Sequence, residues 1–573
     1  MNELRISIGQ YSSAGRKELN QDSLGVKIPK PPLLHSKGIA IALADGISSS
    51  PVSQQASDTA VASFLEDYYC TPDAWSVKKS AQQVLRAINS WLYSQTRRSQ
   101  YHYDFDRGFV CTFSAMIIKS TTAYIFHVGD SRIYRLHQRS MEQLTQDHRI
   151  RLSELENYLS RALGFHQQLD LDYQSFSLEP GDWFVLASDG VYEYIDATHI
   201  HEALQSSNND LDAAARHIVD QAYQLGSEDN LSIQLLRIDS LPQGNVDETL
   251  QQRTTLPFPP ILEPRMSFDG YRIVRQLHIS DRSHVYLAVD TATETTVVIK
   301  TPSLALREHP GYLERFLLEE WIARRIDNSH VLKAYEPTRP RNAIYIVMEY
   351  ISGQTLQQWL TDHPNPALET VRDIVDQLVR GLRAFHRLEM LHQDLRPENI
   401  MIDQTGTVKI IDFGSVWVAG LSEDDHSVDQ DPVPGAIQYA APEYFLGDGG
   451  SVQSDLFALG VICYQLLSGK LPYGASVARI HNRMEQRRLK YRPLAFYDDL
   501  NIPIWVDETI RKAVHPEAGK RYQELSEFSY DLRHPNKHYL RKQRAPLLER
   551  DPVLFWQILS VLLCLVIVFL LIK

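Results

Sequence analysis

Three short motifs in the second half of the chain constrain its fold more than any other feature of the sequence. They are His392–Asn399, Asp412–Gly414 and Ala441–Glu443, and they follow one another in that order. The first contains Asp394 and ends in an Asn, and the second opens on another Asp. Oxygen ligands of this kind suit Mg²⁺. Because three ordered motifs rarely arise together by chance, they predict one domain that brings them to a common site.

This order and spacing resemble the catalytic loop, the Asp-Phe-Gly motif and the Ala-Pro-Glu motif of protein kinases. The resemblance implies a bilobal protein-kinase fold over residues 268–535, with ATP as the phosphate donor. It implies that Asp394 accepts the proton of a substrate hydroxyl, while Asn399 and Asp412 hold Mg²⁺ on the phosphates. Arg396 stands where the family has a Lys that touches the transferred phosphate, so the charge is kept and the geometry changes.

Motifs upstream extend this resemblance. Thr296–Lys300 resembles the strand whose Lys contacts the α- and β-phosphates of the nucleotide. The helical stretch Arg315–Arg325 follows, and its spacing favours Glu319 over Glu320 as the partner of Lys300. A solvated lysine at a strand end is the alternative. The spacing to the later motifs favours the nucleotide contact.

The phosphate-binding loop departs from the family pattern. Its three glycines would fall on His278, Ser280 and Ser283, between strands expected at Tyr271–Leu277 and Val285–Asp290. Glycine lets backbone N–H groups approach a phosphate closely. Ser280 and Ser283 are predicted to offer their hydroxyls to the phosphates instead, whereas His278 is bulkier. We therefore expect weaker nucleotide binding than in a typical kinase.

Two positions near the catalytic loop also differ. Gln393 replaces the Arg that usually pairs with a phosphate on the activation loop, so activation by loop phosphorylation is not expected. Ala436 stands where the family often has a Thr bonded to the catalytic Asp. Two structural features are kept: Asp455 resembles the residue that caps the catalytic loop, and Arg521 is the expected partner of Glu443.

The first half of the chain alternates short apolar strands with two amphipathic helical stretches, expected at Ser53–Tyr69 and Val77–Arg97. Acidic residues stand near the ends of the strands. Aspartates in such positions suit Mg²⁺ and Mn²⁺, which bind a few carboxylates and retain water. For any single Asp-Gly pair, a plain turn is the alternative. The strands are expected at Gly38–Ala44, Phe113–Ile118, Ala123–Val128 and Trp183–Ala187, and the acidic motifs are Asn20–Asp22, Ala44–Gly46, Gly129–Arg132, Ser188–Gly190 and Glu228–Asn230.

These five motifs together resemble the metal-dependent type 2C protein phosphatases (the PPM family), over residues 1–238. The resemblance implies an αββα sandwich in which two metal ions generate a hydroxide that attacks phospho-Ser or phospho-Thr. Asp130 is implied to be structural, and Asp106 matches loosely the acidic ligand of a third ion. The implied metal ligands are the carboxylates of Asp22, Asp45, Asp189 and Asp229 and the carbonyl of Gly46.

Two positions depart from the phosphatase pattern. Gln21 replaces the Glu that usually precedes the first Asp, so a charge near the metal is lost and metal affinity is expected to fall. Lys17 has the spacing of the family's phosphate-binding Arg, and Arg16 is one residue earlier. Either side chain could hold a phosphate, although Lys lacks the bidentate fork of Arg. With four Asp ligands present, we expect an active phosphatase.

Length and composition set the wider frame. At 573 residues the chain is too long for one core, so a multidomain α+β protein is expected. The net charge of -13 argues against bulk attraction to nucleic acid. The four cysteines are scattered without a paired motif, which suggests a reducing compartment. Residues 239–267, which contain several prolines, read as a linker.

The C-terminal segment is predicted to bind a membrane. Residues 553–572 carry no charge and are long enough to cross a bilayer, and the basic segment 536–552 precedes them. Basic residues favour the cytoplasmic side. One C-terminal transmembrane helix is therefore expected, with the catalytic domains in the cytoplasm and the chain in the cytoplasmic (inner) membrane. A buried core helix is the alternative.

The favoured interpretation is a bifunctional signalling enzyme, anchored to a membrane, that phosphorylates Ser and Thr of protein substrates and also removes such phosphates. Its expected cofactors are Mg²⁺ or Mn²⁺ in both halves, with ATP as substrate. A second interpretation is an active phosphatase regulated by a pseudokinase that binds a nucleotide or a partner. A scaffold with two inactive domains is the third, and the four Asp residues argue against it because buried carboxylates are costly without a role. The sequence specifies neither the substrates nor the oligomeric state.

Overall fold

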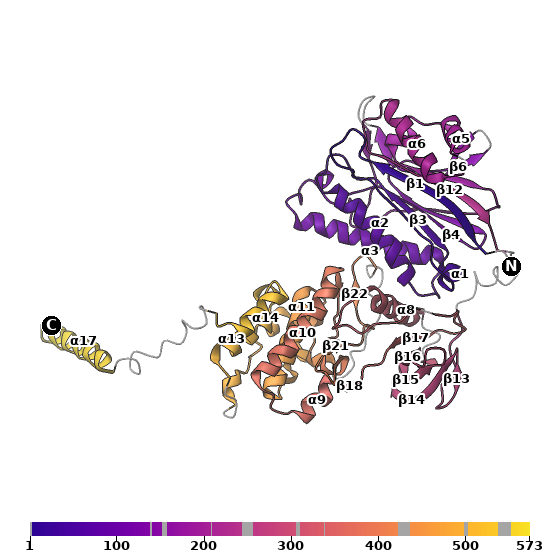
Figure 1. Cartoon of the computed structure of the whole chain (residues 1–573). Helices are drawn as coiled ribbons and strands as arrows, with labels where there is room; N and C mark the ends of the chain where they lie inside the picture. The colour runs from indigo at the N-terminus through magenta and orange to yellow at the C-terminus, as the bar shows by residue number, and fades with distance from the viewer. Residues whose placement is uncertain are drawn as a thin grey trace. The chain divides into compact units, whose positions relative to one another are not determined.

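The computed structural model describes residues 3–137, 140–151, 157–207, 209–242, 256–304, 310–336, 338–421, 436–497, 502–536 and 552–572. The chain divides into two compact units (Figure 1). The first comprises residues 1–352, 384–390 and 412–430, and the second comprises residues 353–383, 391–411 and 431–573. The division falls within the predicted kinase region, so the predicted domain boundaries stay predictions. Most of the predicted linker and of the basic segment lies outside the described residues.

Two five-stranded antiparallel sheets form the framework of residues 3–242. The first has the order β1-β12-β11-β6-β7 and the second β10-β5-β4-β3-β2. The expected strands were right to within one residue at each end. The bounds are β1 Arg5–Ser13, β2 Ser23–Lys27, β3 Ile39–Ala44, β4 Phe113–Lys119, β5 Thr122–Val128, β6 Arg132–His137, β7 Ser140–Gln143, β10 Asp172–Ser177, β11 Trp183–Ala187 and β12 Leu231–Ser240, with the short pair β8 Arg149–Arg151 and β9 Asn157–Leu159.

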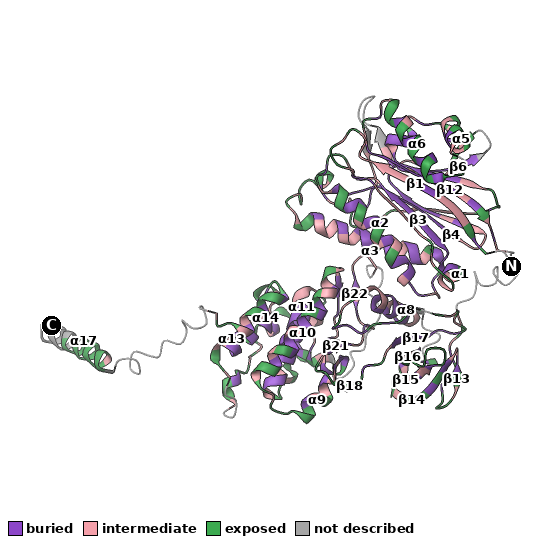
Figure 2. Ribbon diagram, in the orientation of Figure 1, coloured by how far each residue is buried: buried purple, intermediate pink, exposed green. Residues whose placement is uncertain are grey.

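The two sheets pack face to face, and helices cover their outer faces. Apolar side chains of both sheets meet between them, among them Ile41 and Met116 of the second sheet and Leu186 and Leu236 of the first. Every residue of β3 is buried, because one face meets the other sheet and the other face meets helix α2 (Figure 2). This double burial explains why β3 reads as a continuous apolar run. The resulting layers are helix, sheet, sheet and helix.

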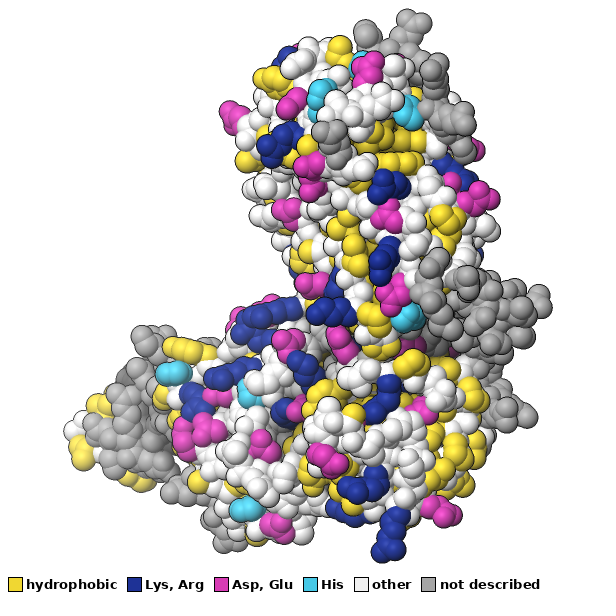
Figure 3. Space-filling model, turned by 45° about the vertical axis from the view of Figure 1, so that its right-hand side comes forward, with side chains coloured by type: hydrophobic (Ala, Val, Ile, Leu, Met, Phe, Trp, Pro, Cys, Tyr) yellow, Lys and Arg dark blue, Asp and Glu magenta, His cyan; other side chains and the backbone are white. Residues whose placement is uncertain are grey.

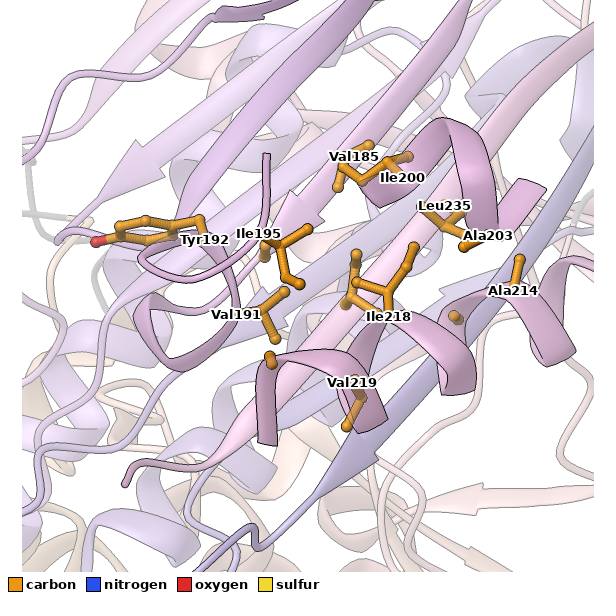
Figure 4. Close-up of a cluster of buried hydrophobic side chains, with 14 of the residues drawn as sticks. Val185, Val191, Tyr192, Ile195, Ile200, Ala203, Ala214, Ile218, Val219 and Leu235 are labelled. Atoms are coloured by element: carbon orange, nitrogen blue, oxygen red, sulfur yellow. The ribbon is translucent and has the colours of Figure 1, made fainter. Parts of the chain in front are cut away.

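The outer helices follow from capping and apolar periodicity. Helix α3 begins after Ser76, whose side chain accepts a hydrogen bond from the Lys79 N–H. On the first sheet, Ile218 and Val219 of α6 and Ile200 of α5 pack against Val185 and Leu235 (Figure 4). The bounds are α1 Leu33–Lys37, α2 Ser53–Cys70, α3 Val77–Arg98, α4 Asp189–Tyr192, α5 Ala197–Ser206 and α6 Leu211–Gln224, with the 3₁₀ turn η1 Phe105–Arg107.

A third five-stranded sheet, of order β13-β14-β15-β16-β17, completes the first unit together with helix α8. Helix α8 spans Pro310–Arg325, which is longer than the expected 315–325. Strand β14 extends to Ile279, two residues beyond its expected end at Leu277. The phosphate loop is therefore shorter than predicted. The strands are β13 Ser267–Phe268, β14 Tyr271–Ile279, β15 Ser283–Asp290, β16 Thr296–Pro302 and β17 Ile346–Glu349.

The second unit is mainly helical. Most residues of helix α11 are buried, and the helix is followed by Gly469, whose φ of 64° is the left-handed conformation that glycine adopts easily. The three-stranded sheet β18-β20-β21 lies beside the loop that contains Asp394 and Asn399. The remaining bounds are β18 Gly353–Thr355, β20 Ile400–Asp403, β21 Val408–Ile410, β19 Met390–Leu391, β22 Trp417–Val418, α9 Leu356–Asp362, α10 Leu368–Arg387, α11 Val452–Ser468, α12 Arg483–Arg487, α13 Ile504–Ala513, α14 Leu525–Arg533 and α17 Pro552–Ile572, with 3₁₀ turns η3 Pro397–Asn399, η4 Ala436–Gln438, η5 Pro442–Leu446, η6 Gly474–Arg479, η7 Leu494–Phe496 and η8 Ala518–Lys520.

The C-terminal helix α17 coincides with the predicted anchor. Its side chains are described only through Cys564, so those of residues 565–572 lie outside the described part. A search of the described residues finds no helix that is both long and apolar enough to cross a membrane. The predicted transmembrane helix is therefore not shown.

Candidate active sites

Four aspartates of the first half meet where strands of the two opposed sheets end. Asp22 precedes β2, Asp45 follows β3, Asp189 opens α4 after β11, and Asp229 precedes β12. Ser188 Oγ donates a hydrogen bond of 2.9 Å to Asp22 Oδ2. The sandwich thus brings together residues that are far apart in the sequence.

The pKa values of these carboxyl groups report how closely they are grouped. Burial raises the pKa of Asp45 well above its usual value, and the neighbouring charges of Asp22 and Asp189 raise it further. Burial is also the main reason why the pKa of Asp189 rises to about 7, with contributions from Asp130 and Asp229. Groups that oppose each other's ionisation in this way favour a divalent cation among them.

Asp22 carries a second sign of a cation site. Its side chain is buried, and burial raises its pKa. Among the described residues, its Oδ1 atom has no hydrogen-bond partner. A buried oxygen without a partner is costly, and a bound cation would satisfy it. The donor set therefore fits Mg²⁺ or Mn²⁺.

The described arrangement is nevertheless not a closed cage of protein ligands. Within the described part of the chain, no group of three or more His, Cys, Asp or Glu side chains could hold a metal ion by itself. Two of the carboxylates contact cationic side chains: Lys17 pairs with Asp229, and Arg149 Nη2 lies 2.9 Å from Asp189 Oδ2. Mg²⁺ commonly binds through one or two carboxylates and several waters, so a full cage is not a requirement.

Gln21 has a clear structural task. Its Nε2 donates hydrogen bonds of 2.9 Å to the Ser50 carbonyl and 2.7 Å to Ser53 Oγ. The Ser50 carbonyl accepts this bond besides one of 2.9 Å from Ser53 Oγ, and an ionised Glu at position 21 would donate none and would repel the carbonyl oxygen. The neighbouring Gly46 is also constrained, because a Cβ there would lie 2.8 Å from the Gln21 carbonyl oxygen. The loop after β3 is thereby held against Asp22.

The two candidate phosphate-binding cations lie in different places. Lys17 pairs with Asp229 and donates a hydrogen bond of 2.5 Å to Ser48 Oγ. Arg16 instead donates to the carbonyls of Tyr223 and Gly226, both at 3.2 Å, at the end of α6. Lys17 is therefore the candidate that the fold brings to the carboxylates.

Arg149 is a site residue that the sequence did not reveal. Besides Asp189 it pairs with Asp130 and, at 3.4 Å, with Glu193. It follows Asp147-His148 rather than one of the acidic motifs, so only the folded chain places it here. For Asp106, predicted loosely as a ligand of a third ion, the carbonyl oxygen accepts a hydrogen bond of 2.8 Å from Ser49 Oγ.

A second charged centre lies on the third sheet. Lys300 Nζ contacts Glu319 Oε1 at 2.6 Å and Oε2 at 2.8 Å, and lies 3.4 Å from Asp412 Oδ1. Burial opposes the charge of Lys300, but Asp412 and Glu319 raise its pKa above the usual value. Glu320 turns elsewhere and pairs with Arg341 at 2.8 Å. The partner of Lys300 is thus Glu319, as the spacing favoured.

The second unit contains the remaining predicted catalytic residues. Asn399 Nδ2 donates to the Asp394 carbonyl at 2.9 Å and to its Oδ2 at 3.0 Å. Arg396 Nε lies 3.6 Å from the same carboxylate. The backbone N–H of Gln393, a residue with φ of 64°, donates to Asp455 at 2.9 Å. The Asn399 amide and the Arg396 guanidinium therefore both contact the Asp394 carboxylate.

Comparison with protein families assigns both halves. Residues 10–237 match the family model described as "Protein phosphatase 2C", and residues 271–526 match that of the "Protein kinase domain". The chain joins a phosphatase 2C domain to a protein kinase domain. The two matched regions do not overlap and follow each other along the chain.

Curated relatives of the kinase domain come from several bacteria. The serine/threonine-protein kinase PrkC of Bacillus subtilis is 28% identical over 271 residues, which are 46% of this chain and 40% of that protein. The serine/threonine-protein kinase PknB of Mycobacterium leprae is 30% identical over 279 residues, which are 47% of this chain and 43% of that protein. This chain thus spans less than half the length of either relative.

Among solved structures, the S. agalactiae serine/threonine phosphatase is 24% identical to this chain, with a TM-score of 0.35. The match covers 41% of this chain and all of that one. The assignment of the phosphatase domain rests on the family model.

In the predicted phosphate loop of the kinase domain, two serines hydrogen-bond to each other. Ser280 Oγ donates to the Ser283 carbonyl at 3.1 Å and accepts from the Ser283 N–H at 3.1 Å. These bonds tie the hydroxyl of Ser280 to the turn between β14 and β15. The prediction that Ser280 and Ser283 bind phosphate stays a prediction, and so does the role of His278.

The structural residues of the kinase domain take their expected places. Arg521 pairs with Glu443 at 2.7 and 2.8 Å, and both side chains are buried. Asp455 accepts the N–H groups of His392 and Gln393, both at 2.9 Å. These contacts fix the loop that carries Asp394.

Proposed function

We propose that this chain both installs and removes phosphate on Ser and Thr side chains of proteins. The observation that carries the proposal is the presence of two separate centres in one chain. One is the cluster of carboxyl groups around Asp22 and Asp45, whose pKa values are raised by burial and by one another's charge. The other is the buried pair of Lys300 and Glu319 beside Asp412.

In the phosphatase domain, Asp22, Asp45, Asp189 and Asp229 would hold the divalent ions, with the Gly46 carbonyl beside them. When bound, such ions supply an activated water and neutralise charge on the phosphate. Lys17 lies next to Asp229 and would bind the phosphate oxygens of the substrate. Arg149 also contacts Asp189 and would compete with a bound cation for its carboxylate.

In the kinase domain, Lys300 would bind the phosphates of ATP, because Glu319 orients its ammonium group. Asp394 would accept the proton of the attacking Ser or Thr hydroxyl, since Asn399 fixes its carboxylate. Asn399 and Asp412 would hold the Mg²⁺ ions that accompany ATP. Arg396 would stabilise the charge on the transferred phosphoryl group.

A second candidate function is an active phosphatase that a pseudokinase domain regulates. The turn closed by Ser280 and Ser283 favours it, because the Ser280 hydroxyl is already hydrogen-bonded to the protein. The intact Lys300–Glu319 pair favours transfer instead.

One experiment separates the two. The full chain is incubated with γ-labelled ATP and Mg²⁺ or Mn²⁺, as wild type, Asp394→Ala and Asp22→Ala. An active kinase loses incorporated label with Asp394→Ala, and label persists longer with Asp22→Ala because removal is blocked. Equal labelling of wild type and Asp394→Ala would exclude the kinase activity and leave the second candidate.

The proposal includes attachment to the cytoplasmic face of the inner membrane through α17. Its support is the set of exposed apolar side chains along the described part of this helix, Val553, Trp556, Ile558 and Val561 among them. Deleting residues 552–573 should move the chain from the membrane fraction to the soluble fraction. An unchanged distribution would refute the anchor.

A further inference from the structure

The kinase helix α8 has two buried faces. One face presents Glu319 to Lys300, as described above. Trp321 is two positions further on, which places it on the opposite side of the helix. Its side chain is fully buried. The structure shows what covers it.

The C-terminal end of phosphatase helix α2 covers this second face. The Trp321 Nε1–H donates to the Asp67 carbonyl at 3.4 Å, and the Trp321 ring lies 6.3 Å from that of Trp75. All these residues belong to the first compact unit. Figure 1 shows α8 next to α2 and α3 within that unit. The largest side chain of α8 is thus buried by the phosphatase domain.

Two arginines of α8 strengthen the contact. Arg324 Nη2 donates to the Tyr69 carbonyl at 2.8 Å, at the end of α2, where unpaired carbonyls and the helix dipole attract a cation. Arg325 Nε lies 2.8 Å from Asp67 Oδ2. The exposed fractions of the Arg325 and Asp67 side chains are 6% and 13%, so this ion pair is largely withdrawn from water. Burial raises the pKa of Asp67, and the neighbouring charge of Arg325 opposes that rise.

Phosphatase helix α3 contacts a second segment of the kinase domain, at Arg387 and Glu389. Arg98 contacts both carboxylate oxygens of Glu389, at 2.8 and 3.1 Å, and the Trp91 Nε1–H donates to the Arg387 carbonyl at 3.1 Å. Glu389 in turn accepts the N–H of Ala419 at its carbonyl, at 3.1 Å. Ala419 follows the Asp412–Gly414 motif, so α3 reaches the start of the activation segment through Glu389.

We propose that the phosphatase domain positions α8 and the start of the activation segment, and so acts as a built-in positioning element of the kinase domain. The inference rests on the proposed kinase activity. In this chain Gln393 stands where an Arg would read loop phosphorylation, and the contacts of α2 and α3 supply another way to fix the same two elements. The kinase then depends on the fold of the phosphatase domain but not on its hydrolytic activity.

The test uses charge reversal at Asp67 and Arg325 in the full chain. Arg325→Glu should lower labelled phosphoryl transfer on the order of tenfold, mainly through kcat, because Glu319 on the same helix is no longer held. Asp67→Arg should do the same, and the double variant Asp67→Arg/Arg325→Glu should recover much of the rate. Lys79→Ala, which removes an exposed ion pair with Glu314 at 2.6 Å, is the matched control and should change little.

Two further readouts make each outcome decisive. Hydrolysis of p-nitrophenyl phosphate shows that the phosphatase domain of each variant is folded. Hydrogen exchange of residues 316–325 should speed up in Arg325→Glu and return toward wild type in the double variant. Unchanged exchange and unchanged transfer in Arg325→Glu would overturn the positioning role. If wild type transfers no phosphate, the proposed kinase activity fails, while the exchange data still decide whether the phosphatase domain holds α8.

Discussion

Arg149 Nη2 lies 2.9 Å from Asp189 Oδ2, so this guanidinium would compete with the divalent cation of the proposed phosphatase site for the same carboxylate. Replacing Arg149 with Ala removes that competitor and leaves more negative charge at the cluster. We expect the half-saturating Mn²⁺ concentration for hydrolysis to fall about fivefold, the worth of one partly exposed ion pair. Arg149→Lys keeps the charge and should stay near wild type. Weaker Mn²⁺ binding in Arg149→Ala would show that Arg149 organises the site rather than competing for it.

Gln21 is predicted to be a stability residue. In Gln21→Glu, an ionised carboxylate would face the Ser50 carbonyl without a donor, which should cost about 1–3 kcal/mol of unfolding free energy. Denaturant unfolding of the full chain, followed by fluorescence, measures it. Gln54→Glu on the exposed side of α2 is the matched control and should lie within about 0.5 kcal/mol of wild type. A Gln21→Glu variant as stable as the control would contradict this role.

Glu319 and Glu320 pair with different cations, so we expect their substitution to have different effects on the kinase activity. Glu319→Gln breaks the buried pair with Lys300 and should lower kcat/KM for transfer on the order of 10²-fold. Glu320→Gln leaves that pair intact and removes the charge opposite Arg341 instead. Its effect should appear first as lower stability. Equal losses of transfer in both variants, at equal stability, would be inconsistent with this assignment.

The turn at the phosphate loop gives a prediction about ATP. Ser280 Oγ is hydrogen-bonded to Ser283, so Ser280→Ala should change the KM for ATP by less than about threefold. Steady-state transfer with varied ATP measures this. A much larger rise in KM would mean that the hydroxyl leaves the turn and binds phosphate, as the sequence predicted.

Lys37 makes the stability of the phosphatase domain depend on pH. Burial lowers its pKa to about 7, although Asp73 opposes the shift, and the ammonium donates to Thr71 Oγ1 at 2.8 Å. Between about pH 7 and pH 10 the unfolded chain binds this proton and the folded chain does not, so stability should rise with pH. The gain is at most about 1.4 kcal/mol per pH unit. Lys37→Met should lose this dependence, and parallel curves for both proteins would disprove it.

Surface charge does not bear on these predictions. On the face shown in Figure 3, Lys and Arg side chains are interspersed with Asp and Glu side chains.

The sequence alone predicted a phosphatase-like and a kinase-like region and named most of the residues that meet in the two charged centres. Asp22, Asp45, Lys300 and Asp394 stand in short motifs at strand ends and loops, where local backbone and spacing restrict which residue can serve. The strands β3 and β11 were also predictable, because each reads as a short continuous apolar run.

The tertiary structure decided which side chains meet. Lys17 rather than Arg16 reaches Asp229, and Arg149 joins the cluster from a strand outside every motif. The contact of Asp67 with Arg325 joins residues from two domains, and the sequence around either residue does not predict the other. Such contacts depend on how whole elements pack, and a buried charge finds its partner only when the chain has folded around it.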